Sequence, residues 1–222
     1  MWEPHARALA HDYHVITLDL PGHGALFDVP FTTENVAAVL DQAIDQLAAA
    51  PPLIVGYSLG GFAAIQYAAA HPERTRGLVL AGCTLDFEAW KSWPYEASVA
   101  MASAMPQPLL DNLLDLSLHL VLPDEWARVI ARIPFNRDVL VRTNRYTREH
   151  ARFSQTLAAY RKPVLFINGQ RDLVFRLDER RYAQAQPQAR LEILRGVDHT
   201  APMRSHVAFT DIVQGFAQEV FG

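Results

Sequence analysis

The short segment around Ser58 restricts the fold of this chain more than any other part. It reads GYSLGG over residues 56–61, directly after the apolar run Leu53–Val55 and directly before the helical run Phe62–Ala70. A G-x-S-x-G pattern between a buried strand and a helix is typical of a sharp, strained turn that lifts the serine hydroxyl clear of the sheet. The free N–H groups and the dipole at the start of that helix favour a developing negative charge. The sequence therefore predicts Ser58 to be a nucleophile.

A carboxylate and an imidazole follow Ser58 along the chain, each just after an expected strand. Asp172 comes after the apolar run Val164–Ile167 and a glycine turn, and His199 follows the run Leu191–Leu194. Open parallel sheets place their ligands at the carboxyl ends of the strands, so we expect the three side chains to meet there. A serine, a carboxylate and a histidine in this arrangement carry out nucleophilic catalysis.

Motifs in a fixed order extend this pattern over most of the chain. They are DLPGHG at residues 19–24, GYSLGG at 56–61, NGQRD at 168–172 and GVDH at 196–199. In these motifs the chain resembles the α/β-hydrolase fold superfamily. The resemblance implies an α/β architecture in which a mostly parallel sheet is flanked by helices and a helical lid covers the site.

The resemblance also implies a role for each site residue. Ser58 is the nucleophile, His199 the general base and then the general acid, and Asp172 the group that orients and stabilises the imidazolium. The N–H of Leu59 is the implied oxyanion donor. Asp86 follows another expected strand, where a few superfamily members place the acid. Asp172 is preferred because its Gly-x-x-Asp context matches the superfamily better.

The N-terminal region departs from the superfamily pattern. Members usually begin with two edge strands and a central strand that ends in a His-Gly motif, whose loop donates the second oxyanion N–H. Here Met1–His5 resembles the start of the helix after that loop, and Tyr13–Leu18 is the next expected strand. We therefore expect an N-terminally truncated fold, opened in the middle of the sheet, with weak activity and low stability. A misplaced start and a defective fragment are both open explanations.

Strands and helices alternate along the chain except over a helical segment that matches the superfamily's lid in position, and this predicts three parts. Residues 1–85 form the N-terminal part of the α/β core, 86–160 the lid, and 161–222 the C-terminal part of the core. One helix is expected to begin at Thr32 or Thr33. Another is expected from Ser205 to Val220.

The expected lid is rich in large apolar side chains and in arginines. Trp90 and Trp126 in this segment, and Tyr57 beside the nucleophile, are the candidate substrate-binding aromatics, since such side chains suit a mostly apolar pocket. The arginines predict a solvated helix face, although one of them could instead pair with a substrate carboxylate. They are Arg128, Arg132, Arg137, Arg142, Arg145, Arg148 and Arg152.

Composition excludes several classes of protein. A net charge of −4 does not suggest a nucleic-acid partner or an anionic membrane. Cys83 is the single cysteine, so no disulfide framework is expected. No metal constellation and no phosphate or dinucleotide loop is readable, so no cofactor is expected. Because there is no signal-peptide pattern and no apolar run of about 18 residues, we expect a cytoplasmic protein with a small-molecule substrate. Its oligomeric state is left open.

Three hypotheses about function remain. The first is a serine hydrolase that acts on a small, mostly apolar ester, amide or thioester. The second is a lyase on the same triad, since the elbow and the arginine-bearing lid also resemble the menaquinone-pathway synthase that eliminates pyruvate. The third is an inactive truncated fragment or a non-catalytic binding protein. The hydrolase is the prediction that the motifs favour.

Overall fold

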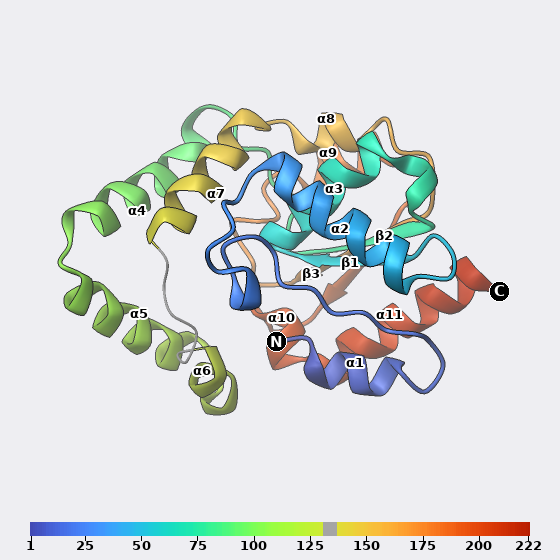
Figure 1. Ribbon diagram of the computed structural model, residues 1–222, viewed down its shortest axis with the longest axis horizontal. Coiled ribbons are helices and arrows are strands. Elements are labelled where there is room, and N and C mark those ends of the chain that lie inside the picture. Colours follow the sequence, from blue (N-terminus) through green and yellow to red (C-terminus); the bar gives the residue numbers. More distant parts are fainter. Residues whose placement is uncertain (131–136) are drawn as a thin grey trace.

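The computed structural model describes residues 1–130 and 137–222. Within them, four parallel strands form one sheet in the order β1-β2-β3-β4 (Figure 1). The strands are β1 (Leu53–Tyr57), β2 (Gly77–Ala81), β3 (Val164–Gly169) and β4 (Arg190–Leu194). Helices connect them, because parallel neighbours require a crossover. The predicted α/β-hydrolase architecture, with a parallel sheet flanked by helices, is confirmed.

Helices separate the strands, and among the described residues a run of five helices stands between β2 and β3. In chain order the helices are α1 (Glu3–Leu9), α2 (Thr33–Leu47), α3 (Leu59–Ala70), α4 (Trp93–Ala104), α5 (Gln107–Val121), α6 (Asp124–Ile130), α7 (Arg137–Glu149), α8 (Phe153–Leu157), α9 (Glu179–Ala185), α10 (Ala201–Arg204) and α11 (His206–Phe221). Short 3₁₀ turns are η1 (Gly24–Leu26), η2 (Pro72–Arg74) and η3 (Ala89–Ser92). The Thr32 hydroxyl accepts from the Asn35 N–H at 3.2 Å, so the predicted cap of α2 is confirmed.

The sheet is buried on both faces by different helices. Leu78 and Leu80 of β2 belong to a core shared with α3 and α8. Val79 and Ala81 of the same strand belong to a second core shared with α11. This division follows from the alternation of side chains along a strand. In Figure 1, α3 and α8 lie on one side of the sheet, and α1 and α11 lie on the other.

The strand expected over Tyr13–Leu18 is wrong. Residues 14–20 have no regular secondary structure, and no backbone hydrogen bond among the described residues joins them to β1. Leu18 and Leu20 still pack against the core. An apolar segment becomes a strand only where a neighbouring strand supplies ladder hydrogen bonds. In the described part of the chain, β1 pairs with β2 alone.

Helices α4 to α7 extend sideways from the sheet (Figure 1). Buried ion pairs and hydrogen bonds fix the base of this segment. Asp178 accepts two contacts of 2.6 Å from the Lys91 ammonium, and it accepts the Asp86 N–H at 2.9 Å. The division of the chain at residues 86 and 160 stays a prediction. Among the described residues, no helix is both long enough and apolar enough to cross a membrane.

Candidate active site

The turn from β1 to α3 holds Ser58 in a strained backbone conformation. Its φ is 51° and its ψ is −119°, and it is the one non-glycine residue with positive φ in the part of the chain that the structure describes. The turn is also tight. A Cβ atom added to Gly56 would lie 2.5 Å from the Gly60 carbonyl oxygen and 2.7 Å from the Gly61 Cα. The backbone path therefore requires glycine at position 56, as the motif predicts.

Three side chains from three strand ends meet at this turn. The His199 Nε2 lies 3.1 Å from the Ser58 Oγ, and the His199 Nδ1 lies 2.7 Å from the Asp172 Oδ2. Both distances are within hydrogen-bond range. A histidine held between a carboxylate and a serine hydroxyl can accept the hydroxyl proton and carry it. The structure thus brings together the three residues that the sequence predicted to converge.

Backbone and aromatic contacts hold the acid and the imidazole in place. The Phe175 N–H donates to the Asp172 Oδ1 at 3.0 Å. The Phe175 ring stacks on the His199 ring, with centroids 4.1 Å apart and planes 18° apart. The Tyr57 hydroxyl donates to the His199 carbonyl at 2.9 Å. A Cβ at Gly82 would lie 2.9 Å from the His199 Cε1, so a glycine there gives the ring its space.

Asp86, the second candidate acid, serves another contact. It is 1% exposed, and it accepts from the Ser154 N–H at 2.9 Å and from the Ser154 hydroxyl at 2.5 Å. The partner of His199 is Asp172 instead. Cys83 is fully buried, and this burial raises the pKa of its thiol, which keeps the thiol protonated.

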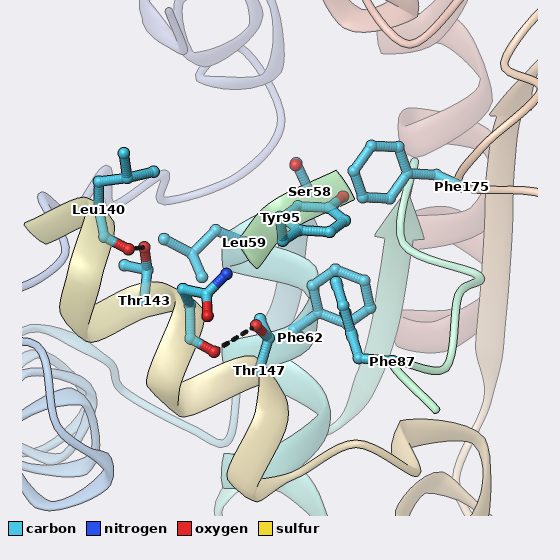
Figure 2. A pocket seen from close by; sticks show the side chains of 10 residues that line it. Ser58, Leu59, Phe62, Phe87, Tyr95, Leu140, Thr143, Thr147 and Phe175 are labelled. Carbon is cyan, nitrogen blue, oxygen red and sulfur yellow. Dashed lines mark hydrogen bonds between the residues drawn. The ribbon is translucent and has the colours of Figure 1, made fainter. Parts of the chain in front are cut away.

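A cavity of about 130 Å³ opens beside Ser58 (Figure 2). Its walls are mostly apolar, and the polar side chains of the lining come from α7, from Ser58 and from Tyr95 of α4. The described lining residues are Ser58, Leu59, Phe62, Phe87, Tyr95, Leu140, Thr143, Asn144, Thr147 and Phe175. Burial, with a smaller effect of Asp172, raises the pKa of Tyr95, so its phenol stays neutral. The cavity suits a small and mostly apolar group.

The predicted substrate-binding residues lie at different places. Leu59 lines the cavity, whereas Tyr57, Trp90 and Trp126 are not among its described lining residues. Tyr57 contacts His199 from the side, with ring centroids 5.0 Å apart. Trp90 is 68% exposed, and Trp126 is 6% exposed in a cluster with Met203. Substrate contact by these aromatics stays a prediction.

The arginine positions agree with a solvated helix face. On α7, Arg142, Arg145 and Arg148 are exposed. Arg137 is partly buried and donates to the Met105 carbonyl at 2.8 Å. The predicted Arg132 lies outside the described residues.

Sequence reasoning missed two parts of the site. Phe175 comes three residues after Asp172, but its ring reaches His199 only through the path of the loop. Leu140, Thr143 and Thr147 lie at i, i+3 and i+7 of α7, which places them on one face of that helix. This spacing could have been recognised in the sequence, because the arginines of α7 occupy other positions and leave these residues together on one face of the helix.

No group of three or more His, Cys, Asp or Glu side chains that could hold a metal ion occurs among residues 1–130 and 137–222.

Comparison with known sequences assigns the chain to a family. The sequence model of the alpha/beta hydrolase family matches residues 1–212. The chain is also similar to proteins named pimeloyl-[acyl-carrier protein] methyl ester esterase. The relative from Chromobacterium violaceum is 38% identical over an alignment of 108 positions, which covers 47% of this chain and 40% of that protein. The relative from Nitrosomonas europaea is 27% identical over an alignment of 224 positions, which covers 92% of this chain and 85% of that protein.

Solved structures with low sequence identity share the fold. A carboxylesterase structure from Nitrososphaera gargenis has a TM-score of 0.80 at 20% identity, covering 99% of this chain and 85% of that one. A thermophilic esterase from Thermogutta terrifontis has a TM-score of 0.79 at 20% identity, with the same coverage of 99% and 85%. The names of the sequence relatives support the assignment to the hydrolase class of enzymes.

Proposed function

The chain belongs to the alpha/beta hydrolase family, and from this premise we propose that it is a serine hydrolase acting on a small, mostly apolar ester. The observation that carries the proposal is the contact chain from the Ser58 Oγ through His199 to Asp172, with distances of 3.1 Å and 2.7 Å. The strained turn at Ser58 and the helix that begins at Leu59 add to it.

In the proposed mechanism, His199 moves one proton twice. The Nε2 of His199 takes the proton from the Ser58 Oγ while the Oγ attacks the ester carbonyl carbon. The imidazolium then gives this proton to the leaving alkoxide, and the alcohol departs from an acyl-enzyme. Water attacks the acyl group by the same route, which releases the acid and restores Ser58. Asp172 fixes the tautomer of His199 and stabilises its charged form.

The oxyanion of each tetrahedral intermediate needs hydrogen-bond donors. Leu59 is the first residue of α3, so its N–H has no acceptor within the helix. We assign this N–H as one donor. It follows the nucleophile directly, which is the position of such a donor in a nucleophile elbow.

The cavity and the relatives favour an ester over the other substrates. The described walls around Ser58 are mostly apolar, and a volume of about 130 Å³ resembles that of a cavity that holds benzene. The similar proteins are named for methyl ester hydrolysis. We therefore propose a short carboxylic ester as the substrate, and we assign α4 to α7 as the lid over it.

Active-site labelling tests the proposal. A fluorophosphonate probe is expected to form a stable adduct on Ser58, and p-nitrophenyl esters are expected to release p-nitrophenolate together with one equivalent of acid. Ser58→Ala should lose the label and lower kcat by roughly 10³-fold or more. Ser117→Ala is the matched control, because that serine is exposed on α5. Equal turnover by Ser58→Ala and the parent would rule out the nucleophile.

A further inference from the structure

The wall of the cavity formed by α7 carries three polar side chains, in addition to the hydroxyls of Ser58 and Tyr95 elsewhere in the lining. Thr143, Asn144 and Thr147 line the cavity together with Leu140, at the i, i+3, i+4 and i+7 spacing of one helix face. Figure 2 shows Thr143 and Thr147 on α7, with Phe175 across the cavity from them. A polar strip therefore faces a mostly aromatic wall.

The threonines of this strip use their hydroxyl protons within the helix. The Thr143 hydroxyl donates to the Leu140 carbonyl at 3.1 Å, and the Thr147 hydroxyl donates to the Asn144 carbonyl at 2.9 Å. The Asn144 side chain differs from them. Its Nδ2 is buried and has no hydrogen-bond partner among the described residues. A buried amide donor without an acceptor is unfavourable and rare, so this group is available to a ligand oxygen.

We propose that Asn144 is a specificity residue that donates a hydrogen bond to a neutral carbonyl oxygen in the acyl part of the substrate. This inference rests on the proposed function and narrows the substrate class to short oxo-acyl or diester-type esters. The acyl part is the one concerned, because it stays attached to Ser58 after the alcohol leaves. A small cavity that has Ser58 in its lining suits the group that stays.

The charge of the cavity indicates a neutral acceptor. Its described lining contains no Lys, Arg or His side chain. Arg142, Arg145 and Arg148 of α7 are exposed. A carboxylate in the cavity would be desolvated without a cationic partner, which is far less favourable than burying a ketone or ester carbonyl. One amide N–H can satisfy such a carbonyl.

Matched p-nitrophenyl esters test the inference. The series contains a straight alkanoyl ester, the same chain with one CH₂ replaced by a ketone at successive positions, and a chain of equal length that ends in a carboxylate. Each kcat/KM is divided by the rate of hydroxide hydrolysis of that ester, which removes the electronic effect of the ketone. At one ketone position, the corrected kcat/KM of the parent enzyme is expected to be about three- to tenfold higher for the oxo ester than for the alkanoyl ester. This ratio corresponds to the net free energy of one neutral hydrogen bond. The carboxylate ester is expected to be the poorest substrate.

Two variants and a control locate the preference. Asn144→Leu should reduce the oxo-to-alkanoyl ratio to about one and raise Tm, because the unpaired donor is gone. Asn144→Asp keeps the shape and has no donor once its carboxyl is ionised, so it should also abolish the preference when it is assayed at alkaline pH. If Asn144→Leu does not fold, the ratio for Asn144→Asp decides. Arg145→Gln, next in sequence and exposed, should keep the parent ratio.

The outcomes separate this inference from the proposed function. Ester turnover with equal rates for oxo and alkanoyl chains would overturn the role of Asn144 and leave the hydrolase intact. A preference for the oxo ester that survives in both Asn144 variants would also overturn the role of Asn144 and leave the hydrolase intact. A preference for the carboxylate ester would have the same consequence. Absence of both turnover and Ser58 labelling would refute the proposed function and the inference with it.

Discussion

From the stacking of Phe175 on His199 we predict how much this ring contributes to kcat. The two rings are nearly parallel, with centroids 4.1 Å apart, so the imidazole lies over the face of the phenyl ring. In the proposed mechanism this imidazole becomes a cation in both tetrahedral transition states. An aromatic face stabilises a nearby cation by about 1–2 kcal/mol in a partly desolvated site. Phe175 should therefore stabilise the transition state more than the ground state.

Phe175→Leu removes the aromatic face and keeps an apolar side chain in the cavity. A loss of about 1–2 kcal/mol corresponds to roughly a five- to thirtyfold decrease in kcat. KM is expected to change less, because leucine still packs against the acyl group. The backbone of residue 175 should continue to hold Asp172 and to accept from Thr84, since both contacts use main-chain atoms. Steady-state kinetics on one p-nitrophenyl ester measure both constants.

Phe87→Leu provides the matched comparison for this experiment. Phe87 lines the same cavity, but its ring contacts are with Phe62, Tyr95 and Phe153 rather than with the imidazole. We expect it to raise KM and to leave kcat nearer to that of the parent. Phe175→Tyr should keep most of the parent kcat because it keeps the aromatic face. If Phe175→Leu lowers kcat no more than Phe87→Leu does, stacking does not stabilise the imidazolium and the reasoning is wrong.

Three further changes test other contacts. Asp172→Asn should lower kcat by roughly 10⁴-fold with little change in secondary structure by circular dichroism, because an amide holds His199 in the wrong tautomer; a decrease below tenfold would contradict the assigned acid. Burial, followed by a smaller effect of His206, lowers the pKa of His5 from 6.5 to about 4. Between pH 6.5 and pH 4, the unfolded chain therefore binds a proton at His5 that the folded chain does not bind, and stability decreases as the pH falls. Tm should fall by roughly 5 °C over this range. A His5→Gln variant should lack that part of the decrease. Asp178→Asn should lower the free energy of unfolding in urea by about 3 kcal/mol, because it leaves Lys91 without its buried partner; an unchanged midpoint would exclude a structural role for this pair.

The parts of the fold and site that local patterns define could be predicted from the sequence. Ser58 follows a buried strand and begins a helix, and such a junction has few other solutions for its backbone. Asp172 and His199 follow strands that the apolar runs already marked. Because these strands are parallel, their carboxyl ends lie at one edge of the sheet, and the three side chains meet there.

The parts that depend on non-local partners could not be predicted. The Tyr13–Leu18 segment has the apolar content of a strand, but its conformation depends on whether another strand lies beside it. Trp90 and Trp126 are residues of the same type in the same expected helical segment, yet Trp90 is exposed and Trp126 is buried. Which face of a helix meets the core is decided by packing between helices. No residue type in this segment specifies that packing alone.

The loop from Asp172 to Asp178 connects the chemistry to the helical segment. At its start, Asp172 binds the His199 Nδ1, and in its middle Phe175 stacks on the same imidazole and lines the cavity. At its end, Asp178 binds Lys91, just before α4 begins. Because one short loop makes all three contacts, we expect a displacement at the base of α4 to move the acid and the stacked ring as well. Residues 172–178 thus connect the base of the proposed lid to the proposed acid and base by direct contacts.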